Sequence, residues 1–122
     1  MPIRRKVVIV VDDDPLMLGA VGRLLKAHGF DVRVFESAEA FLGEEGTTEA
    51  ACLVLDIGLG GMTGIELGRR LAAEGYQLPI IFITGDDNAG AYDEAMATGC
   101  VAFLRKPFPA TQLIGAITRA TG

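Results

Sequence analysis

Polar side chains follow four of the five short apolar segments of this sequence. Three consecutive aspartates, residues 12–14, come directly after the first segment, and Asp56 follows the third. Thr84 ends the fourth segment, and Lys106 follows the fifth. Carboxylates gathered at one place repel each other unless a hard divalent cation neutralises them, and oxygen ligands of this kind suit Mg²⁺. The side chains therefore predict a metal site, provided that the fold brings them together.

The same set of groups fits phosphoryl transfer. One carboxylate in such a cluster can attack phosphorus and form an acyl phosphate. A metal ion, a lysine ammonium and a hydroxyl would then balance the charge on the oxygens of the transferred group. Taken singly, each residue has an ordinary explanation: the aspartates before Pro15 could cap a helix, and Asp56 could be a turn residue. The joint occurrence of complementary groups on separate elements favours the site.

Alternating strand and helix signals predict the elements that must position these groups. Apolar segments rich in β-branched residues predict strands at residues 7–11, 32–35, 52–55, 80–83 and 101–104. Most of these segments are continuous, which is typical of parallel strands covered on both faces. Between them, capping residues and helical spacing predict helices at residues 15–28, 38–42, 64–73, 89–98 and 110–120.

This order predicts an α/β fold. A strand–helix unit repeated five times gives a flavodoxin-like, doubly wound sheet of five parallel strands, (βα)5, with helices on both faces. Ligands in such folds bind outside the carboxyl ends of the strands. The polar residues that follow the strands are therefore expected at one edge of the sheet.

Size and charge limit the function classes. The chain has 122 residues and a mass of 12.9 kDa, so we expect a single domain over residues 1–122. The formal net charge of −5 disfavours direct contact with nucleic acid. Its apolar runs fall well short of the about 20 residues that a membrane span needs, and no signal-peptide pattern is present. We therefore expect a cytoplasmic protein without membrane association, in which Cys52 and Cys100 are free, buried thiols.

The sequence resembles the receiver domain of two-component response regulators over essentially its whole length. The matching segments are residues 10–14, 53–56, 61–67, 79–85 and 103–108, which read VVDDD, LVLD, GMTGIEL, PIIFITG and FLRKPF. Residues 37–42 (SAEAFL) and 82–85 (FITG) are most similar to the FixJ-type branch, whose receivers usually precede a DNA-binding helix-turn-helix domain. The sequence leaves open whether this receiver stands alone or belongs to a longer regulator.

This resemblance implies a metal-dependent phosphoacceptor. Asp56 would take a phosphoryl group from the phosphohistidine of a sensor histidine kinase. Asp12 and Asp13 would hold Mg²⁺, for which Mn²⁺ can substitute, with Asp13 as a direct ligand and Asp12 acting through water. Asp56 itself and the backbone carbonyl of Gly58 would complete the protein ligands. The domain would promote its own phosphorylation and dephosphorylation without being a turnover enzyme.

The resemblance also implies a switch. Thr84 and Lys106 would bind phosphoryl oxygens, and Pro107 would follow a cis peptide bond that aims Lys106 into the site. The ring of Phe103 would turn inward as Thr84 moves toward the phosphoryl group. The readout would pass to an output domain, a downstream protein or a phosphorylation-dependent homodimer through the fourth helix, fifth strand and fifth helix. On that fifth helix we expect these residues to face outward: Thr111, Gln112, Gly115, Ala116, Thr118 and Arg119.

The sequence departs from the family pattern beside Asp56. Gly60 stands where the family usually has proline, so with Gly58 and Gly61 it predicts a more flexible loop. Gly58 lacks a side chain where many receivers carry one, and Asp86 is acidic. We expect these two positions to influence the lifetime of the phosphorylated state.

Other functions fit less well. A haloacid-dehalogenase-type phosphatase would match the spacing of the aspartates, but Leu16 stands where threonine or valine is needed and the chain is short for that fold. A nucleotide-binding flavodoxin-like module lacks its glycine-rich motifs here. His28, as a phosphorelay residue, is better explained as a helix-terminal histidine. The alternative that keeps the fold is a pseudo-receiver, which would act as a phosphorylation-independent interaction module.

Overall fold

The computed structural model describes residues 5–44, 49–85 and 89–122. Its strands are β1 (Val7–Val11), β2 (Asp31–Phe35), β3 (Ala50–Asp56), β4 (Ile80–Thr84) and β5 (Ala102–Arg105). Its helices are α1 (Pro15–Ala27), α2 (Ala38–Leu42), α3 (Gly64–Ala73), α4 (Ala89–Ala97) and α5 (Ala110–Thr121).

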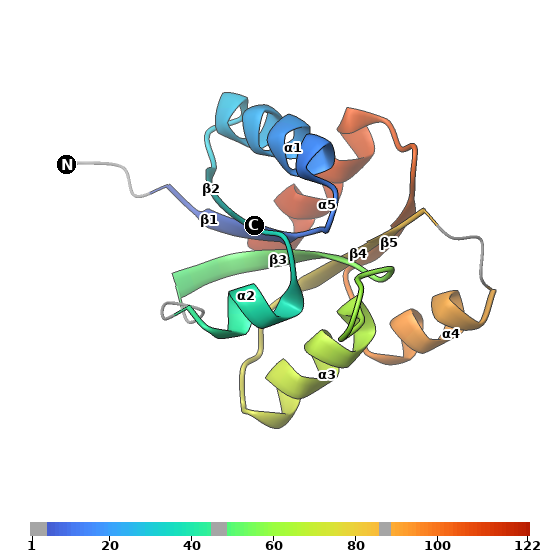
Figure 1. The fold of residues 1–122 in the computed structure, drawn as a ribbon. Coiled ribbons are helices and arrows are strands. Elements are labelled where there is room, and N and C mark those ends of the chain that lie inside the picture. Colours follow the sequence, from blue (N-terminus) through green and yellow to red (C-terminus); the bar gives the residue numbers. More distant parts are fainter. Residues whose placement is uncertain (1–4, 45–48, 86–88) are drawn as a thin grey trace.

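All strands pair in parallel in one sheet with the order β2-β1-β3-β4-β5. Helices α1 and α5 cover one face of this sheet, and α2, α3 and α4 cover the other (Figure 1). The order reverses between β1 and β3, as in flavodoxin-like folds. The predicted doubly wound α/β fold is confirmed. In the described part of the chain, no helix is long and apolar enough to cross a membrane.

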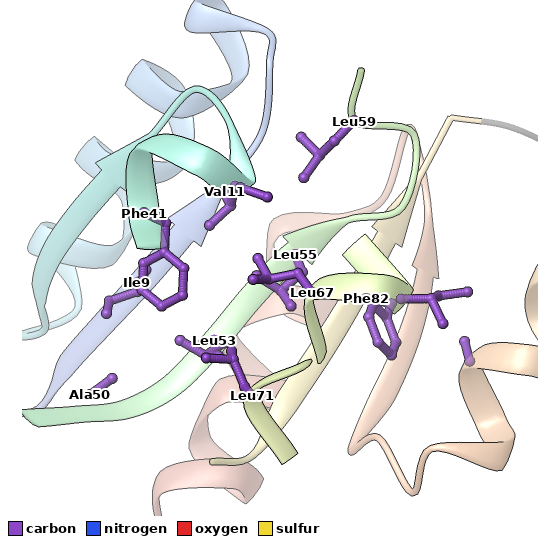
Figure 2. Close-up of a cluster of buried hydrophobic side chains, with 13 residues drawn as sticks. Ile9, Val11, Phe41, Ala50, Leu53, Leu55, Leu59, Leu67, Leu71 and Phe82 are labelled. Atoms are coloured by element: carbon purple, nitrogen blue, oxygen red, sulfur yellow. The ribbon is translucent and has the colours of Figure 1, made fainter. Parts of the chain in front are cut away.

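Each face of the sheet has its own apolar core. Under α2 and α3, side chains such as Phe41, Leu55, Leu67 and Phe82 form one buried cluster (Figure 2). Under α1 and α5, side chains from both helices pack on the opposite faces of the same strands. The inner strands are buried on both faces, which explains their continuous apolar sequences. At the edge strand β2, Val34 is 46% exposed.

The central strand β3 is longer than the sequence pattern predicts. It begins at Ala50 and ends with Asp56 itself, which pairs with Ile83 of β4. Because β3 lies between β1 and β4, it forms backbone hydrogen bonds with both, and these extend the strand beyond its purely apolar segment. Asp56 is therefore held by sheet hydrogen bonding and does not begin a free loop.

Helix α5 corrects one expectation. Ala116, predicted to face outward, is fully buried and packs with Leu113 and Ile117 in the core under α1 and α5. The side chains of Thr111, Gln112, Thr118 and Arg119 are exposed as predicted, and Gly115 is half-buried. A neutral alanine fits either face of a helix, so the sequence alone did not resolve its side.

Both cysteines are free, as predicted, but they differ in environment. Cys52 is buried as predicted, whereas Cys100, which was also predicted to be buried, is only half-buried. Burial raises the pKa of the Cys52 thiol to about 12, so its reactive thiolate is scarce at pH 8. Burial raises the pKa of Cys100 as well, while hydrogen bonds lower it in part.

We expect the two thiols to differ in reactivity. With a chromogenic disulfide reagent at pH 8, native protein should react slowly at Cys100 and leave Cys52 untouched, whereas protein in urea should react at both. Peptide mapping after alkylation identifies each site, and a Cys100→Ser variant is the control. Rapid modification of Cys52 in native protein would contradict the buried position of this residue.

Candidate functional site

The carboxyl ends of β1 and β3 lie side by side at the point where the strand order reverses. Asp12 directly follows β1, and Asp56 ends β3. Lys106 directly follows β5, on the other side of β4. The fold thus brings three of the predicted site residues from distant parts of the sequence to one edge of the sheet.

Asp12 is fully buried, and both of its carboxylate oxygens are engaged. Oδ1 accepts a hydrogen bond from the backbone N–H of Asp14 at 2.9 Å. Oδ2 accepts one from Lys106 Nζ at 2.8 Å. Asp14 itself caps α1, because its side chain accepts a hydrogen bond from the Leu16 N–H with Pro15 in the first helical turn. Of the three aspartates, the third therefore has the capping role that the sequence allowed.

Asp56 is 4% exposed and contacts two groups. Its Oδ1 accepts a hydrogen bond from the Gly58 N–H at 3.0 Å, and its Oδ2 accepts one from Lys106 Nζ at 3.1 Å. A Cβ placed on Gly58 would lie 3.6 Å from Asp56 Oδ1, an ordinary contact distance. A side chain at position 58 would therefore lie directly beside this carboxylate.

Burial and charge act against each other at this site. The pKa of Asp56 is raised, first by burial and then by the neighbouring charge of Asp12, although the Gly58 N–H and Lys106 lower it in part. Burial would lower the pKa of Lys106, but hydrogen bonding to Asp12 and the charge of Asp56 outweigh burial and raise it. The lysine is therefore a fixed positive charge between two carboxylates at neutral pH.

Asp13 completes an acidic cluster. One carboxylate oxygen from each of Asp12, Asp13 and Asp56 lies within 4.8 Å of the others, and Asp13 is exposed to solvent. Hard carboxylate oxygens in this number are the donors that Mg²⁺ takes, with water filling the remaining positions. The donor set fits a magnesium ion, and the open side at Asp13 gives it access from solvent.

The structure also places the remaining predicted residues. Thr84 is buried at the end of β4, next to the strand that precedes Lys106. The Lys106–Pro107 peptide bond is cis, as the resemblance implied. Phe103 lies on β5, paired in register with Phe82, and is half-buried. Asp86 lies outside the described residues.

Three contacts around the site were not predicted from the sequence. Tyr92 of α4 packs edge to face on Phe103, with ring centroids 5.2 Å apart. Gly64 begins α3 so close to β3 that a Cβ there would lie 2.4 Å from the Asp56 carbonyl oxygen. Glu39 of α2 contacts the backbone of the loop after Asp56. The motif GMTG contained Gly64, but no local sequence signal marks Tyr92 or Glu39.

Known proteins are similar to this chain in sequence. Residues 8–118 match the family described as the response regulator receiver domain. The response regulator protein TmoT of Ectopseudomonas mendocina is 38% identical over 117 residues, which are 96% of this chain and 53% of TmoT. The transcriptional regulatory protein FixJ of Bradyrhizobium diazoefficiens is 37% identical over 113 residues, which are 93% of this chain and 55% of FixJ.

A solved structure of a related receiver is similar to this chain in fold. The crystal structure of FixJ-N superposes with a TM-score of 0.87 at 36% identity, covering 98% of this chain and 95% of that one. The chain spans about half the length of the curated relatives that it matches. Since the family match covers nearly the whole fold, the chain belongs to the receiver domains of two-component response regulators.

Proposed function

We propose that Asp56 is the phosphoacceptor of this receiver and takes its phosphoryl group from the phosphohistidine of a sensor histidine kinase. The observation that carries the proposal is the position of Asp56, whose carboxylate contacts Lys106 and lies within 4.8 Å of oxygens from Asp12 and Asp13. Phosphorylation of an aspartate with Mg²⁺ is typical of the family to which the chain belongs.

In the proposed step, a carboxylate oxygen of Asp56 attacks phosphorus. A P–O bond forms as the P–N bond of the donor breaks, and the imidazole nitrogen leaves with the electron pair. Lys106 is already held beside the attacking carboxylate and would bind a phosphoryl oxygen, and the Thr84 hydroxyl would bind another. These groups would stabilise the negative charge of the transferred group in the transition state.

The metal ion would be held by Asp12, Asp13, Asp56 and the backbone carbonyl of Gly58. Of the first two, Asp13 would be a direct ligand and Asp12 would act through water. Mg²⁺ supplies positive charge to the phosphoryl oxygens when bound, and Mn²⁺ can substitute. Asp12 is held rigidly by its two hydrogen bonds, which supports a positioning role at one side of the cluster.

The phosphoryl group would be read out through Thr84 and Phe103. Phosphorylation adds about −1.5 to −2 charges at the strand ends, which shifts an equilibrium between conformations. Movement of Thr84 would let Phe103 turn inward and alter the surface of α4, β5 and α5. Tyr92 and Met96 are exposed on α4, 43% and 44% respectively, which supports a protein contact there with a second copy, an output domain or a downstream protein.

We propose that residues 1–122 form one receiver domain, in the cytoplasm, that contacts neither nucleic acid nor membrane itself. It would catalyse only its own phosphorylation and dephosphorylation and would not turn over an external substrate. In a longer regulator, the output would come from a second domain. The FixJ relative is named as a transcriptional regulatory protein, which suggests transcription as the regulated process.

Intact-mass measurement tests the phosphoacceptor proposal. Protein incubated with acetyl phosphate and Mg²⁺ should gain the mass of one phosphoryl group, and borohydride reduction followed by peptide mapping should locate it at Asp56. A chelator should prevent the gain, and Mn²⁺ should restore it. If folded protein gains no phosphoryl group from acetyl phosphate or from a cognate kinase, the pseudo-receiver alternative replaces this proposal.

A further inference from the structure

We propose that Glu39 is a positioning residue that holds the loop between β3 and α3, residues 57–63, in the conformation that the metal site needs. This inference rests on the proposed function, because the loop contains Gly58, whose carbonyl is the proposed metal ligand. Glu39 lies on α2, in a separate part of the sequence, and does not belong to the acidic cluster of Asp12, Asp13 and Asp56.

The loop has few local constraints of its own. Gly58, Gly60 and Gly61 lack the Cβ that restricts the backbone of other residues. A Cβ on Gly60 would meet nothing within 4 Å, so packing does not define the backbone there. Leu59 is 5% exposed and belongs to the core under α2 and α3 (Figure 2). Leu59 therefore anchors the first half of the loop. In the second half the Met62 side chain packs, partly buried, against the same core, and its backbone N–H has a further contact.

Glu39 provides that contact. Its Oε2 accepts a hydrogen bond from the Met62 N–H at 3.4 Å. A Cβ on Gly61, which has a φ of +79°, would lie only 3.2 Å from the same oxygen. The carboxylate thus lies against the backbone of two successive loop residues. Glycine at position 61 permits both the left-handed backbone and this close approach.

The backbone of α2 is anchored in the fold on both sides of Glu39. Its neighbour Ala38 is fully buried, and Phe41 is 1% exposed in the same core as Leu59. Ser37 caps the helix by accepting a hydrogen bond from the Ala40 N–H at 3.0 Å. Because α2 is anchored on both sides of Glu39, the side chain of Glu39 extends toward the loop from a fixed backbone position.

The consequence for the site runs through Gly58. The Gly58 N–H donates a hydrogen bond to Asp56 Oδ1. The loop conformation therefore sets both this contact and the direction of the Gly58 carbonyl. Without the Glu39 contact, the glycine-rich segment would sample more conformations, and metal binding would have to order it again. The apparent affinity for Mg²⁺ would then fall in proportion to the fraction of molecules whose loop has the conformation that binds the metal.

Three variants test the role of Glu39. Glu39→Ala removes the acceptor, whereas Glu39→Gln keeps an acceptor oxygen at the same place and removes only the charge. Glu74→Ala is the matched control, because it removes an exposed glutamate at the opposite end of α3 from the loop. All three should keep the melting temperature of the parent within a few degrees, since surface changes have small effects on stability.

The readouts do not depend on phosphorylation. We expect Glu39→Ala to speed amide hydrogen exchange of Gly61 and Met62 and to weaken Mg²⁺ binding about two- to fivefold, as followed by the Gly58 amide signal in NMR titrations. Glu39→Gln should keep both values close to those of the parent, and Glu74→Ala should change neither. Unchanged exchange and affinity in Glu39→Ala would overturn the proposal. Equal losses in Glu39→Gln and Glu39→Ala would also overturn it, in favour of a general effect of charge.

These experiments separate this inference from the proposed phosphoacceptor. If Glu39→Ala has no effect while the parent gains a phosphoryl group at Asp56, only the role of Glu39 fails. If the parent is not phosphorylated at all, the phosphoacceptor proposal fails. The exchange and metal-binding measurements on unphosphorylated protein then still decide whether Glu39 positions the loop.

Discussion

Replacing Asp56 with asparagine is expected to abolish phosphorylation by acetyl phosphate, with no detectable gain of mass under conditions in which the parent protein is modified. The amide is a poor nucleophile and cannot form the acyl phosphate. The shape of the side chain is kept, and an amide oxygen can still accept the hydrogen bond that the Gly58 N–H gives to Asp56 Oδ1. The loss would therefore report on chemistry, because the fold around the strand end is preserved.

The same substitution should stabilise the metal-free protein at neutral pH. Burial and the charge of Asp12 raise the pKa of Asp56 in the folded state, despite the opposing contacts with Gly58 and Lys106. A carboxyl whose folded pKa lies above its unfolded value, about 3.9, favours folding only while it is protonated. That contribution is present below the unfolded pKa and is lost as the pH rises through the folded pKa. Asparagine does not titrate, so it avoids this loss.

Urea unfolding with a chelator present measures this effect. The difference in free energy of unfolding between Asp56→Asn and the parent should be larger at pH 7 than at acidic pH. Asp31→Asn is the matched control, because it makes the same change at an exposed site at the start of β2, away from the carboxyl ends of the strands. Phosphorylation of Asp56→Asn would mean that another carboxylate accepts the group, and a variant less stable than the parent at pH 7 would contradict the electrostatic account.

The fold could be predicted from the sequence because its signals are repeated and mutually consistent. Continuous apolar segments such as Val7–Val11 are required where strands are buried on both faces, and the structure buries β1, β3 and β4 in this way. Helix boundaries are equally local: the side chains of Asp14, Ser37 and Thr63 each accept a capping hydrogen bond where the following helix begins. Local chemistry of this kind does not depend on distant contacts.

The proximity of Asp12, Asp56 and Lys106 could be predicted for a different reason. A doubly wound parallel sheet places all carboxyl strand ends at one edge, so polar residues at those ends must lie near one another. The sequence therefore predicted which residues gather there, and the structure adds that Lys106 Nζ bridges two carboxylates, at 2.8 Å from Asp12 and 3.1 Å from Asp56. The roles assigned to these residues in phosphoryl transfer stay predictions until phosphorylation is measured.

Side-chain contacts between separate elements could not be predicted in this way. The contact of Glu39 with Met62 joins α2 to the loop before α3, and the contact of Tyr92 with Phe103 joins α4 to β5. Each depends on how two separate elements are placed and turned relative to one another. An exposed glutamate or tyrosine has no periodicity that reveals its partner. The side of α5 on which Ala116 lies was missed for the same reason, because alanine is compatible with core and surface alike.

The buried position of Ala116 predicts a large loss of stability when a charge is placed there. Ala116→Glu would put a carboxylate among Leu113, Ile117 and the strands of the sheet. The buried side chains of this core cluster are each 5% exposed or less. An ionised carboxylate without a partner in such a place costs several kcal/mol, and we expect a loss of about 3 kcal/mol or more. Domains of this size have about 5–15 kcal/mol in total, so much of the variant should be unfolded or melt at a far lower temperature.

Thr118→Glu is the control for this substitution, because Thr118 is exposed on the opposite side of α5. It should change the free energy of unfolding by about 0.5 kcal/mol or less, in urea unfolding followed by circular dichroism. Comparing Ala116→Glu with Thr118→Glu also shows which substitution can test the surface of α5. Reduced partner binding in Ala116→Glu would reflect loss of the fold, whereas reduced binding in Thr118→Glu would reflect the surface itself. A fully folded Ala116→Glu protein with the stability of the parent would contradict the packing of α5 against the sheet.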